Sequence, residues 1–266
     1  MKGQLIVVWN PICNRAGASS LTLNIGTVLS WIAFRKVHIS NLSCDSAIET
    51  YFKDDMKINY TLDNLKILRE SIDSNSVKMY STAINDKLNI IGGYQIEKGL
   101  IEGVENFSLR YLDEALELND YVIVDLSNQR EYKILEKADT IISVMPMDKI
   151  LLEKAQKTKE WEYVLSEKSI TVFNNLPIGI EDEIAELARK YNLTTTCHFP
   201  SDPNIQYYTS LKNNLYSYVV EELKKRKIKD LYINQLQELM HLILMKEDEE
   251  LYNIGKKSFW GSMKTS

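Results

Sequence analysis

The sequence contains little cysteine, proline or glycine. Its three cysteines, Cys13, Cys44 and Cys197, are widely separated, so they form neither a disulfide framework nor a Cys-x-x-Cys metal pair. With only 5 prolines and 10 glycines in 266 residues, no low-complexity stretch or internal repeat is visible. This cysteine usage favours a protein of the reducing cytoplasm.

Long hydrophobic runs and an excess of basic residues are also missing. No segment approaches the roughly 18 consecutive apolar residues of a membrane-spanning helix. The N-terminus runs directly into a predicted strand, so we expect no signal peptide. The net charge of −5 argues against a surface that binds nucleic acid globally, although it does not exclude a local basic patch. We therefore expect a cytoplasmic protein that would meet a membrane only at its inner face.

The chain does contain an alternation of β-rich apolar runs and helical patterns. Strands are expected at residues 5–9, 37–41, 89–91, 121–125, 140–145 and 170–174, with another near 195–199. Helices are expected at residues 19–34, 61–74, 108–118, 130–137, 148–163, 181–191 and 206–227. This order predicts an α/β fold with a mainly parallel sheet of about seven strands and helices on both faces.

The C-terminal region differs from this pattern. A basic run at 224–229 leads into a stretch with helical spacing of apolar residues at 230–245, and a short basic–aromatic tail follows at 251–264. We therefore divide the chain into an α/β domain, 1–225, and a helical extension with a basic–aromatic tail, 226–266.

The loop at 10–20 lies between the strand 5–9 and the helix 19–34. A strand, a loop of small residues and a helix N-terminus together cradle phosphates through converging backbone N–H groups. A catalytic loop of this kind reads G-x-x-x-x-G-K-[ST], in which the lysine contacts the β- and γ-phosphates and the hydroxyl group binds Mg²⁺. Here Ala18 stands at the lysine position and Ser19 at the hydroxyl position. The loop thus favours binding over turnover.

Residues 13–20, Cys-Asn-Arg-Ala-Gly-Ala-Ser-Ser, align with the loop K-G-G-V-G-K-T-T, and Asn24 matches an asparagine in the helix that follows it. With four later blocks, this loop resembles the MinD/ParA family of deviant Walker A P-loop ATPases. Within that family, residues 17–20 resemble the G-A-S-T version found in the TadZ/CpaE branch of pilus-assembly proteins.

Two of the later blocks correspond to strands that carry acids in this family. Residues 37–45 match the Walker A′ strand, but Asn41 and Ser43 replace both of its acids. An amide can orient a water molecule but cannot accept its proton. The Walker B strand, 121–127, is intact and ends near Asp125, where the family places the acid that supports Mg²⁺.

The last two blocks, 172–175 and 199–204, resemble the segments that line the adenine pocket of the family. The five blocks lie in the family's order between residues 5 and about 210. The resemblance implies nucleotide contacts at Asn14, Arg15, Ala16, Gly17, Ala18, Ser19, Ser20, Asn174, Pro200 and Asp202. It implies Mg²⁺ contacts at Asp125 and Ser19, with ATP or ADP bound weakly or no longer bound. No residue is assigned a catalytic role.

Several of these residues have an alternative role that the sequence leaves open. Asp125 could bond to N–H groups at the end of its strand, and Ser19 could cap the helix. Arg15 could supply the positive charge that Ala18 lacks, or it could be solvated. Cys13 stands where active members carry a signature lysine, and a buried, inert thiol is the simpler interpretation.

The resemblance implies a degenerate MinD/ParA-like protein of the TadZ/CpaE type. Such a protein is a localisation scaffold for a pilus or secretion apparatus at the cytoplasmic membrane, with protein partners, a homodimeric form and little or no ATP hydrolysis. Residues 256–264 could contact the membrane surface or form a disordered end. The alternatives are a ParA-type DNA-partition protein that uses 224–229, and a weak ATPase with unorthodox catalytic groups. The basic run is more readily explained as solvated, so nucleic acid is not an expected partner.

Overall fold

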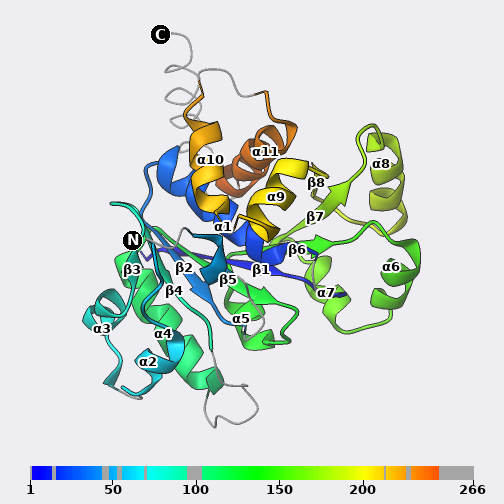
Figure 1. Ribbon diagram of the computed structural model, residues 1–266. Helices are drawn as coiled ribbons and strands as arrows, with labels where there is room; N and C mark the ends of the chain where they lie inside the picture. Colours follow the sequence, from blue (N-terminus) through cyan, green and yellow to red (C-terminus); the bar gives the residue numbers. More distant parts are fainter. Residues whose placement is uncertain are drawn as a thin grey trace.

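An eight-stranded sheet forms the centre of the computed structural model, which describes residues 2–13, 16–43, 48–52, 56–68, 71–94, 104–212, 214–225 and 229–245. The strands are β1 (Gln4–Trp9), β2 (Val37–Asn41), β3 (Thr82–Ala83), β4 (Leu88–Ile91), β5 (Tyr121–Ser127), β6 (Thr140–Met145), β7 (Ser169–Leu176) and β8 (Thr196–Pro200). Their order across the sheet is β3-β4-β2-β5-β1-β6-β7-β8 (Figure 1). All neighbouring pairs are parallel except β3 and β4. The predicted α/β fold is confirmed, and the strand that the sequence did not reveal is the two-residue β3.

Helices cover both faces of this sheet (Figure 1). They are α1 (Ala18–Trp31), η1 (Ile48–Tyr51), α2 (Leu62–Lys66), α3 (Ser74–Met79), α4 (Val104–Leu118), α5 (Tyr132–Lys137), α6 (Lys149–Ala155), α7 (Glu160–Val164), α8 (Glu181–Lys190), α9 (Pro203–Ser210), α10 (Leu215–Leu223) and α11 (Leu231–Met245). Side chains alternate between the faces along each strand. In β1, Ile6 and Val8 pack on the side of α1, α9, α10 and α11, whereas Leu5, Val7 and Trp9 face α2 to α8.

Three predicted helices are interrupted: 61–74, 148–163 and 206–227. Polar side chains at the breaks bond to the backbone and so compete with continued helix. Asp73 caps α3 by accepting a hydrogen bond from the Ser76 N–H at 2.8 Å. After α6, the Thr158 hydroxyl donates to the carbonyl oxygen of Ala155 at 2.8 Å. The apolar spacing continues across these breaks, which is why it predicted single helices.

Helix α11 is the described part of the predicted extension, and it packs against α1 and β8. Its buried side chains belong to the same core as those of α1: Tyr232, Ile233, Leu236, Leu239, Met240 and Ile243. The buried Tyr232 hydroxyl accepts a hydrogen bond from the Asn24 side-chain amide at 3.0 Å. This contact attaches α11 to the helix that follows the phosphate loop.

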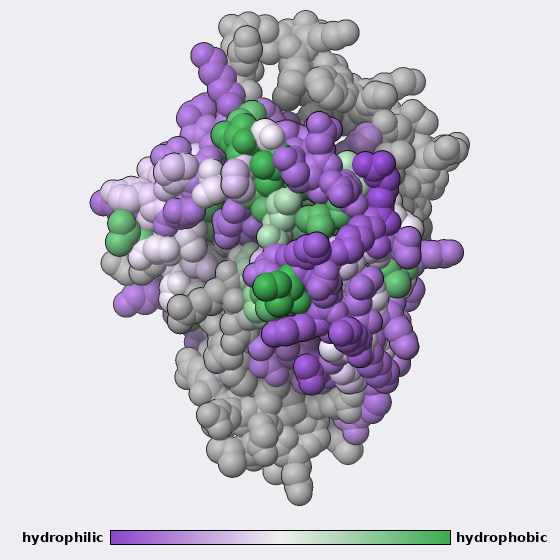
Figure 2. Space-filling view, turned by 90° about the vertical axis from the view of Figure 1, so that its right-hand side faces the viewer, coloured by the Kyte–Doolittle hydropathy of each residue, from purple (hydrophilic) through white to green (hydrophobic). Residues whose placement is uncertain are grey.

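None of the helices within the described ranges is both long and apolar enough to cross a membrane. The face that carries α6 and α8 is mainly hydrophilic, with hydrophobic residues in small separate groups among the described ones (Figure 2). Isolated groups of this kind are normal on a protein surface.

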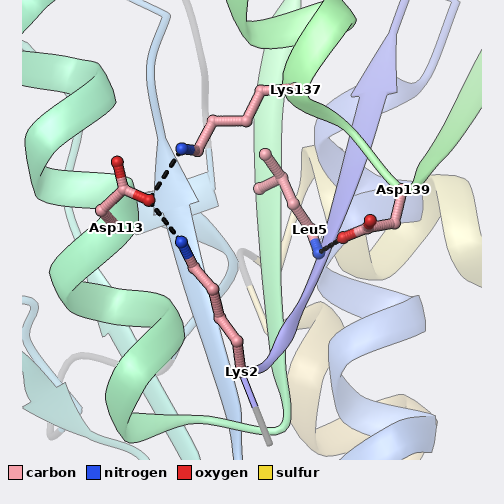
Figure 3. Close-up of polar contacts among 5 residues, drawn as sticks. All are labelled: Lys2, Leu5, Asp113, Lys137 and Asp139. Atoms are coloured by element: carbon pink, nitrogen blue, oxygen red, sulfur yellow. Dashed lines mark hydrogen bonds and ion pairs between the residues drawn. The ribbon is translucent and has the colours of Figure 1, made fainter.

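The amino-terminal end of β1 is held by polar contacts with Asp113 of α4 and with Asp139, which precedes β6 (Figure 3). The Asp113 carboxylate, on α4, forms ion pairs with two lysines. Its Oδ1 atom lies 2.6 Å from Lys2 Nζ and 2.7 Å from Lys137 Nζ. The Leu5 N–H donates to the Asp139 carboxylate at 2.8 Å. These contacts fix the strand at the end opposite the phosphate loop.

His38 is a buried titratable group in the centre of the fold. It lies in β2 with 1% of its surface exposed, and its Nε2 is 2.5 Å from the Tyr111 hydroxyl oxygen. Burial lowers the pKa of His38 to about 4, because the apolar surroundings disfavour the charged ring. The ring is therefore neutral at pH 7.

This shift predicts a loss of stability in mild acid. Between pH 6.5 and 4 the unfolded chain binds a proton at His38 and the folded chain does not, so the free energy of unfolding falls as the pH falls. From pH 7 to pH 5 the contribution is about 2 kcal/mol. Urea unfolding at both pH values measures it: the decrease should be smaller by this amount in His38→Gln and unchanged in the control His198→Gln. An equal decrease in wild type and His38→Gln would contradict the prediction.

Candidate functional site

The phosphate loop begins with a fixed turn after β1. The Asn10 side-chain oxygen, which is buried, accepts hydrogen bonds from the N–H groups of Ile12 at 3.1 Å and Cys13 at 3.0 Å. Burial raises the pKa of the Cys13 thiol, so this group is neutral at pH 7 and does not replace a lysine cation. The predicted contacts Asn14 and Arg15 lie outside the described residues.

The loop ends in a left-handed glycine. Gly17 has a φ of 92° and is the N-cap of α1, and its carbonyl oxygen accepts hydrogen bonds from the Ser20 hydroxyl and the Leu21 N–H, both at 3.0 Å. Ala18 is the first residue of the helix and is buried. The cap position thus belongs to Gly17 and not to Ser19, whose Mg²⁺ contact stays a prediction.

Asn174, at the end of β7, lies against this loop. Its side-chain N–H donates to the Ala16 carbonyl oxygen at 2.8 Å, across 158 positions of sequence. A Cβ atom on Gly17 would lie only 2.2 Å from the Asn174 Nδ2 atom. The Asn174 Oδ1 atom is buried and has no hydrogen-bond partner within the described ranges. The structure therefore brings this predicted base contact to the phosphate loop.

The other two predicted base-pocket residues follow β8. Pro200 is the last residue of β8 and pairs with Leu176 of β7. Asp202 is the N-cap of α9, where its carboxylate accepts hydrogen bonds from the N–H groups of Asn204 at 2.6 Å and Ile205 at 3.2 Å. One carboxylate oxygen of Asp202 therefore has a structural role, and its contact with a base stays a prediction.

Asp125 lies fully buried in β5, paired with Val8 of β1 on one side and Asn41 of β2 on the other. Its Oδ1 atom accepts a hydrogen bond from the Ser127 N–H at 2.8 Å. Ser127 has a φ of 48°, a conformation that is uncommon for a residue with a side chain. The pKa of Tyr51 is raised to about 12, first by burial and then by the charge of Asp125. These contacts place the acid at the carboxyl end of the sheet, on the same edge as the phosphate loop.

Glu49 is a carboxylate at this edge that sequence reasoning missed. The Asn41 side-chain N–H donates to Glu49 Oε1 at 3.0 Å, and the Gly93 N–H donates to the same oxygen. Asn41 Oδ1 accepts from the Ser43 N–H at 2.9 Å. The Asn41 amide thus connects β2 to η1 and, through Glu49, to the end of β4. Nothing in the local sequence pattern distinguished Glu49 from other surface acids.

In the described part of the chain, no group of three or more His, Cys, Asp or Glu side chains gathers as a metal site. A Mg²⁺ ion here would therefore take its ligands from Asp125, from hydroxyl groups and from the phosphate groups of a bound nucleotide. The assignment of Asp125 and Ser19 to Mg²⁺ stays a prediction.

A hollow of about 380 Å³ opens beside the phosphate loop. Its walls are the start of that loop and the turn after β5, and its lining residues are Pro11, Ile12, Asn128, Gln129 and Arg130. The helical pattern predicts that Arg130 begins the helix 130–137, and no motif indicates a function for it. The helix begins later, at Tyr132, and Arg130 belongs to the turn.

No protein-family model matches the sequence, and no curated protein matches it. Among solved structures, a ParA family ATPase from Chlorobium tepidum TLS has a TM-score of 0.73 and 15% identity, over 89% of this chain and 98% of its own. A putative plasmid partition protein from Borrelia burgdorferi B31, bound to AMPPNP, has a TM-score of 0.69 and 17% identity. The match covers 92% of this chain and 100% of that one.

A third similar structure is the septum site-determining protein MinD from Pyrococcus horikoshii OT3, complexed with Mg-ADP. Its TM-score is 0.68 at 14% identity, over 95% of this chain and 98% of that one. The chain thus has the fold of the ParA and MinD ATPases, a P-loop NTPase-like fold. At these identities the likeness establishes the fold alone.

The contact between Gly17 and Asn174 gives a prediction for stability. Gly17→Ala adds a left-handed backbone penalty of about 1–2 kcal/mol and a steric conflict of about 1–3 kcal/mol with Asn174. Gly179→Ala is the matched control, since Gly179 also has a positive φ of 85° but would place its Cβ atom in open space. Urea unfolding should show the larger loss for Gly17→Ala.

A second variant isolates the steric part of this loss. When Asn174→Ala is already present, adding Gly17→Ala should lower the free energy of unfolding by no more than Gly179→Ala lowers it. The reason is that the overlapping amide is gone. Equal losses for the two glycine variants in the wild-type background would show that the overlap is relieved without cost.

Proposed function

We propose that this chain is a degenerate MinD/ParA-like protein of the TadZ/CpaE type, which acts as a binding and localisation scaffold for a pilus or secretion apparatus at the cytoplasmic membrane. It is a pseudo-ATPase with little or no ATP hydrolysis. One observation carries the proposal: Gly17 is a left-handed cap at the start of α1, while Ala18 stands where a catalytic loop has lysine.

The chemistry at the neighbouring strand supports the absence of turnover. Phosphoryl transfer requires charge stabilisation and an oriented nucleophilic water. Asn41 and Ser43 cannot accept a proton at neutral pH, and the amide of Asn41 is already bonded to Glu49. Among the acids that the resemblance implies at the Walker A′ and Walker B strands, only Asp125 is present in this chain.

Weak binding of ATP or ADP is part of the proposal. Backbone N–H groups of a phosphate loop do not depend on side-chain identity. One feature of the structure fits a nucleotide: the buried Asn174 Oδ1 atom lies at the loop without a donor from the described residues. When bound, Mg²⁺ would neutralise phosphate charge, with Asp125 and Ser19 as its protein contacts. The AMPPNP and Mg-ADP of the similar structures support this assignment.

We further propose a homodimer and protein partners of the assembly machine. One similar structure is a complex of MinC with MinD from Aquifex aeolicus, which supports partner binding by this fold. Residues 256–264, outside the described ranges, would contact anionic lipid, with Trp260 at headgroup level and lysines on the phosphates.

DNA partition is the alternative that the basic run 224–229 raises. Two of its described residues have intramolecular contacts: Lys225 pairs with Glu222, and the Lys224 ammonium group lies 4.9 Å from the centre of the Trp31 ring. These contacts favour a structural role. A gel shift at low salt discriminates the two functions, because partition requires salt-sensitive, non-specific DNA binding.

The proposal predicts no measurable turnover. Phosphate release from Mg-ATP by the full chain should equal that of Asp125→Ala, because neither protein can stabilise the transferred phosphoryl group. Metal-dependent release by wild type that disappears in Asp125→Ala would overturn the pseudo-ATPase assignment in favour of a weak ATPase with unorthodox groups.

The proposal also predicts weak, charge-dependent membrane binding. Full-length protein should sediment with vesicles containing anionic phospholipid. Removing two tail charges in Lys256→Ala/Lys257→Ala should weaken binding roughly 30-fold, at about 1 kcal/mol per lysine. The control Lys154→Ala/Lys157→Ala removes the same charge from exposed positions near α6 and should leave binding unchanged. Equal weakening in both variants would show that net charge, and not the tail, controls binding.

A further inference from the structure

The hollow beside the phosphate loop has walls fixed by hydrogen bonds. The Asn10 N–H donates to the Ser127 carbonyl oxygen at 2.6 Å and joins the end of β1 to the turn after β5. The Trp9 indole N–H donates to the Gln129 carbonyl oxygen at 3.0 Å. The left-handed Ser127 redirects the chain at this point. The hollow is therefore part of the folded framework.

Arg130 is the cationic residue in the lining. Its side chain is 69% exposed, and its Nε atom pairs with Glu160 Oε1 at 2.9 Å. The Glu160 side chain is only 7% exposed, and the Tyr132 hydroxyl donates to the same oxygen at 2.7 Å. The pKa of Glu160 is lowered, chiefly by the Tyr132 hydrogen bond, so the carboxylate remains ionised and holds the guanidinium.

This ion pair leaves most of the guanidinium available. Arginine has five N–H donors, and Glu160 lies on the Nε side of this guanidinium group. The four donors on the terminal nitrogens form a planar fork that matches the oxygens of a phosphate group. Because the side chain is already held by Glu160, binding an anion requires less ordering than at a free arginine.

Arg130 lies in one hollow with the start of the phosphate loop. Pro11 and Ile12, which belong to the phosphate loop segment, form the other wall of the same hollow. Two acids at this end of the sheet have structural contacts: Asp125 accepts from Ser127, and Asp148 caps α6. A volume of about 380 Å³ is sufficient for phosphate groups.

We propose that this hollow is a phosphate-binding subsite in which the terminal guanidinium nitrogens of Arg130, whose side chain is held by Glu160, donate to phosphate oxygens. Its ligand is the polyphosphate chain of a nucleoside phosphate bound at the phosphate loop. The inference rests on the nucleotide binding proposed above, and it concerns affinity, not turnover.

The test is calorimetric titration of the full chain with three probes: Mg-ATP, inorganic tripolyphosphate and adenosine. Arg130→Ala should weaken the binding of Mg-ATP and of tripolyphosphate about tenfold or more, which is the range for a lost charge-assisted hydrogen bond. Adenosine binding should not change. Arg130→Lys keeps the charge without the fork and should lose less. The control Arg189→Ala, in α8, removes an equal charge and should have no effect.

Glu160→Gln tests the positioning role of the buried carboxylate. It leaves the arginine charge intact but weakens its support, so we expect a several-fold loss for the two phosphate probes. Unfolding midpoints of all variants verify that they are folded. If Arg130→Ala proves unfolded, the phosphate affinity of Arg130→Lys is compared with that of wild type. A weaker affinity in Arg130→Lys supports the subsite, and an equal affinity contradicts it.

The outcomes separate this subsite from the scaffold function. Equal phosphate affinities in wild type and Arg130→Ala, or no binding of either phosphate probe by wild type at millimolar concentration, overturn the subsite. Neither result affects the membrane and turnover experiments, which test the scaffold. A loss for tripolyphosphate alone supports the subsite but identifies free inorganic polyphosphate as its source of phosphate.

Discussion

The site depends on the position of β1 in the middle of the sheet. The strand is fully buried from Leu5 to Trp9, with β5 on one side and β6 on the other. Because these strands are parallel, the phosphate loop leaves β1 at the same edge where β5 delivers Asp125. A shift of β1 by one residue would exchange its two buried faces, so the hydrophobic core fixes the loop as well as the strand.

The backbone form of the loop and its catalytic side chains are physically separable. The described parts of the loop are held by Asn10, by the left-handed Gly17 and by the Asn174 amide, which donates to Ala16. The groups proposed to be missing for phosphoryl transfer, at Ala18 and Asn41, are side chains that take no part in these contacts. The Asn41 amide even gains a structural role by bonding to Glu49.

Charge at the carboxyl edge is arranged through buried partners. Asp125 is bonded to Ser127, and Glu160 is bonded to Tyr132 while it pairs with Arg130. Each of these carboxylates has at least one fixed donor, as buried charged groups require. The polar groups of the edge are thus held in position by the fold, and this preorganisation favours a binding surface.

The sequence by itself determined the strand and helix alternation, the phosphate loop and the place of Asp125, because these depend on local periodicity and short motifs. It also indicated Asn174, through its place at a strand end. It could not show that Asn174 bonds to Ala16, that Glu49 meets Asn41, or that Glu160 holds Arg130. These contacts join residues on different elements, and only the strand order and the packing of the helices bring them together. The interruption of the long helices has the same cause, since an apolar spacing of 3.6 residues can continue across a break that side-chain hydrogen bonds create.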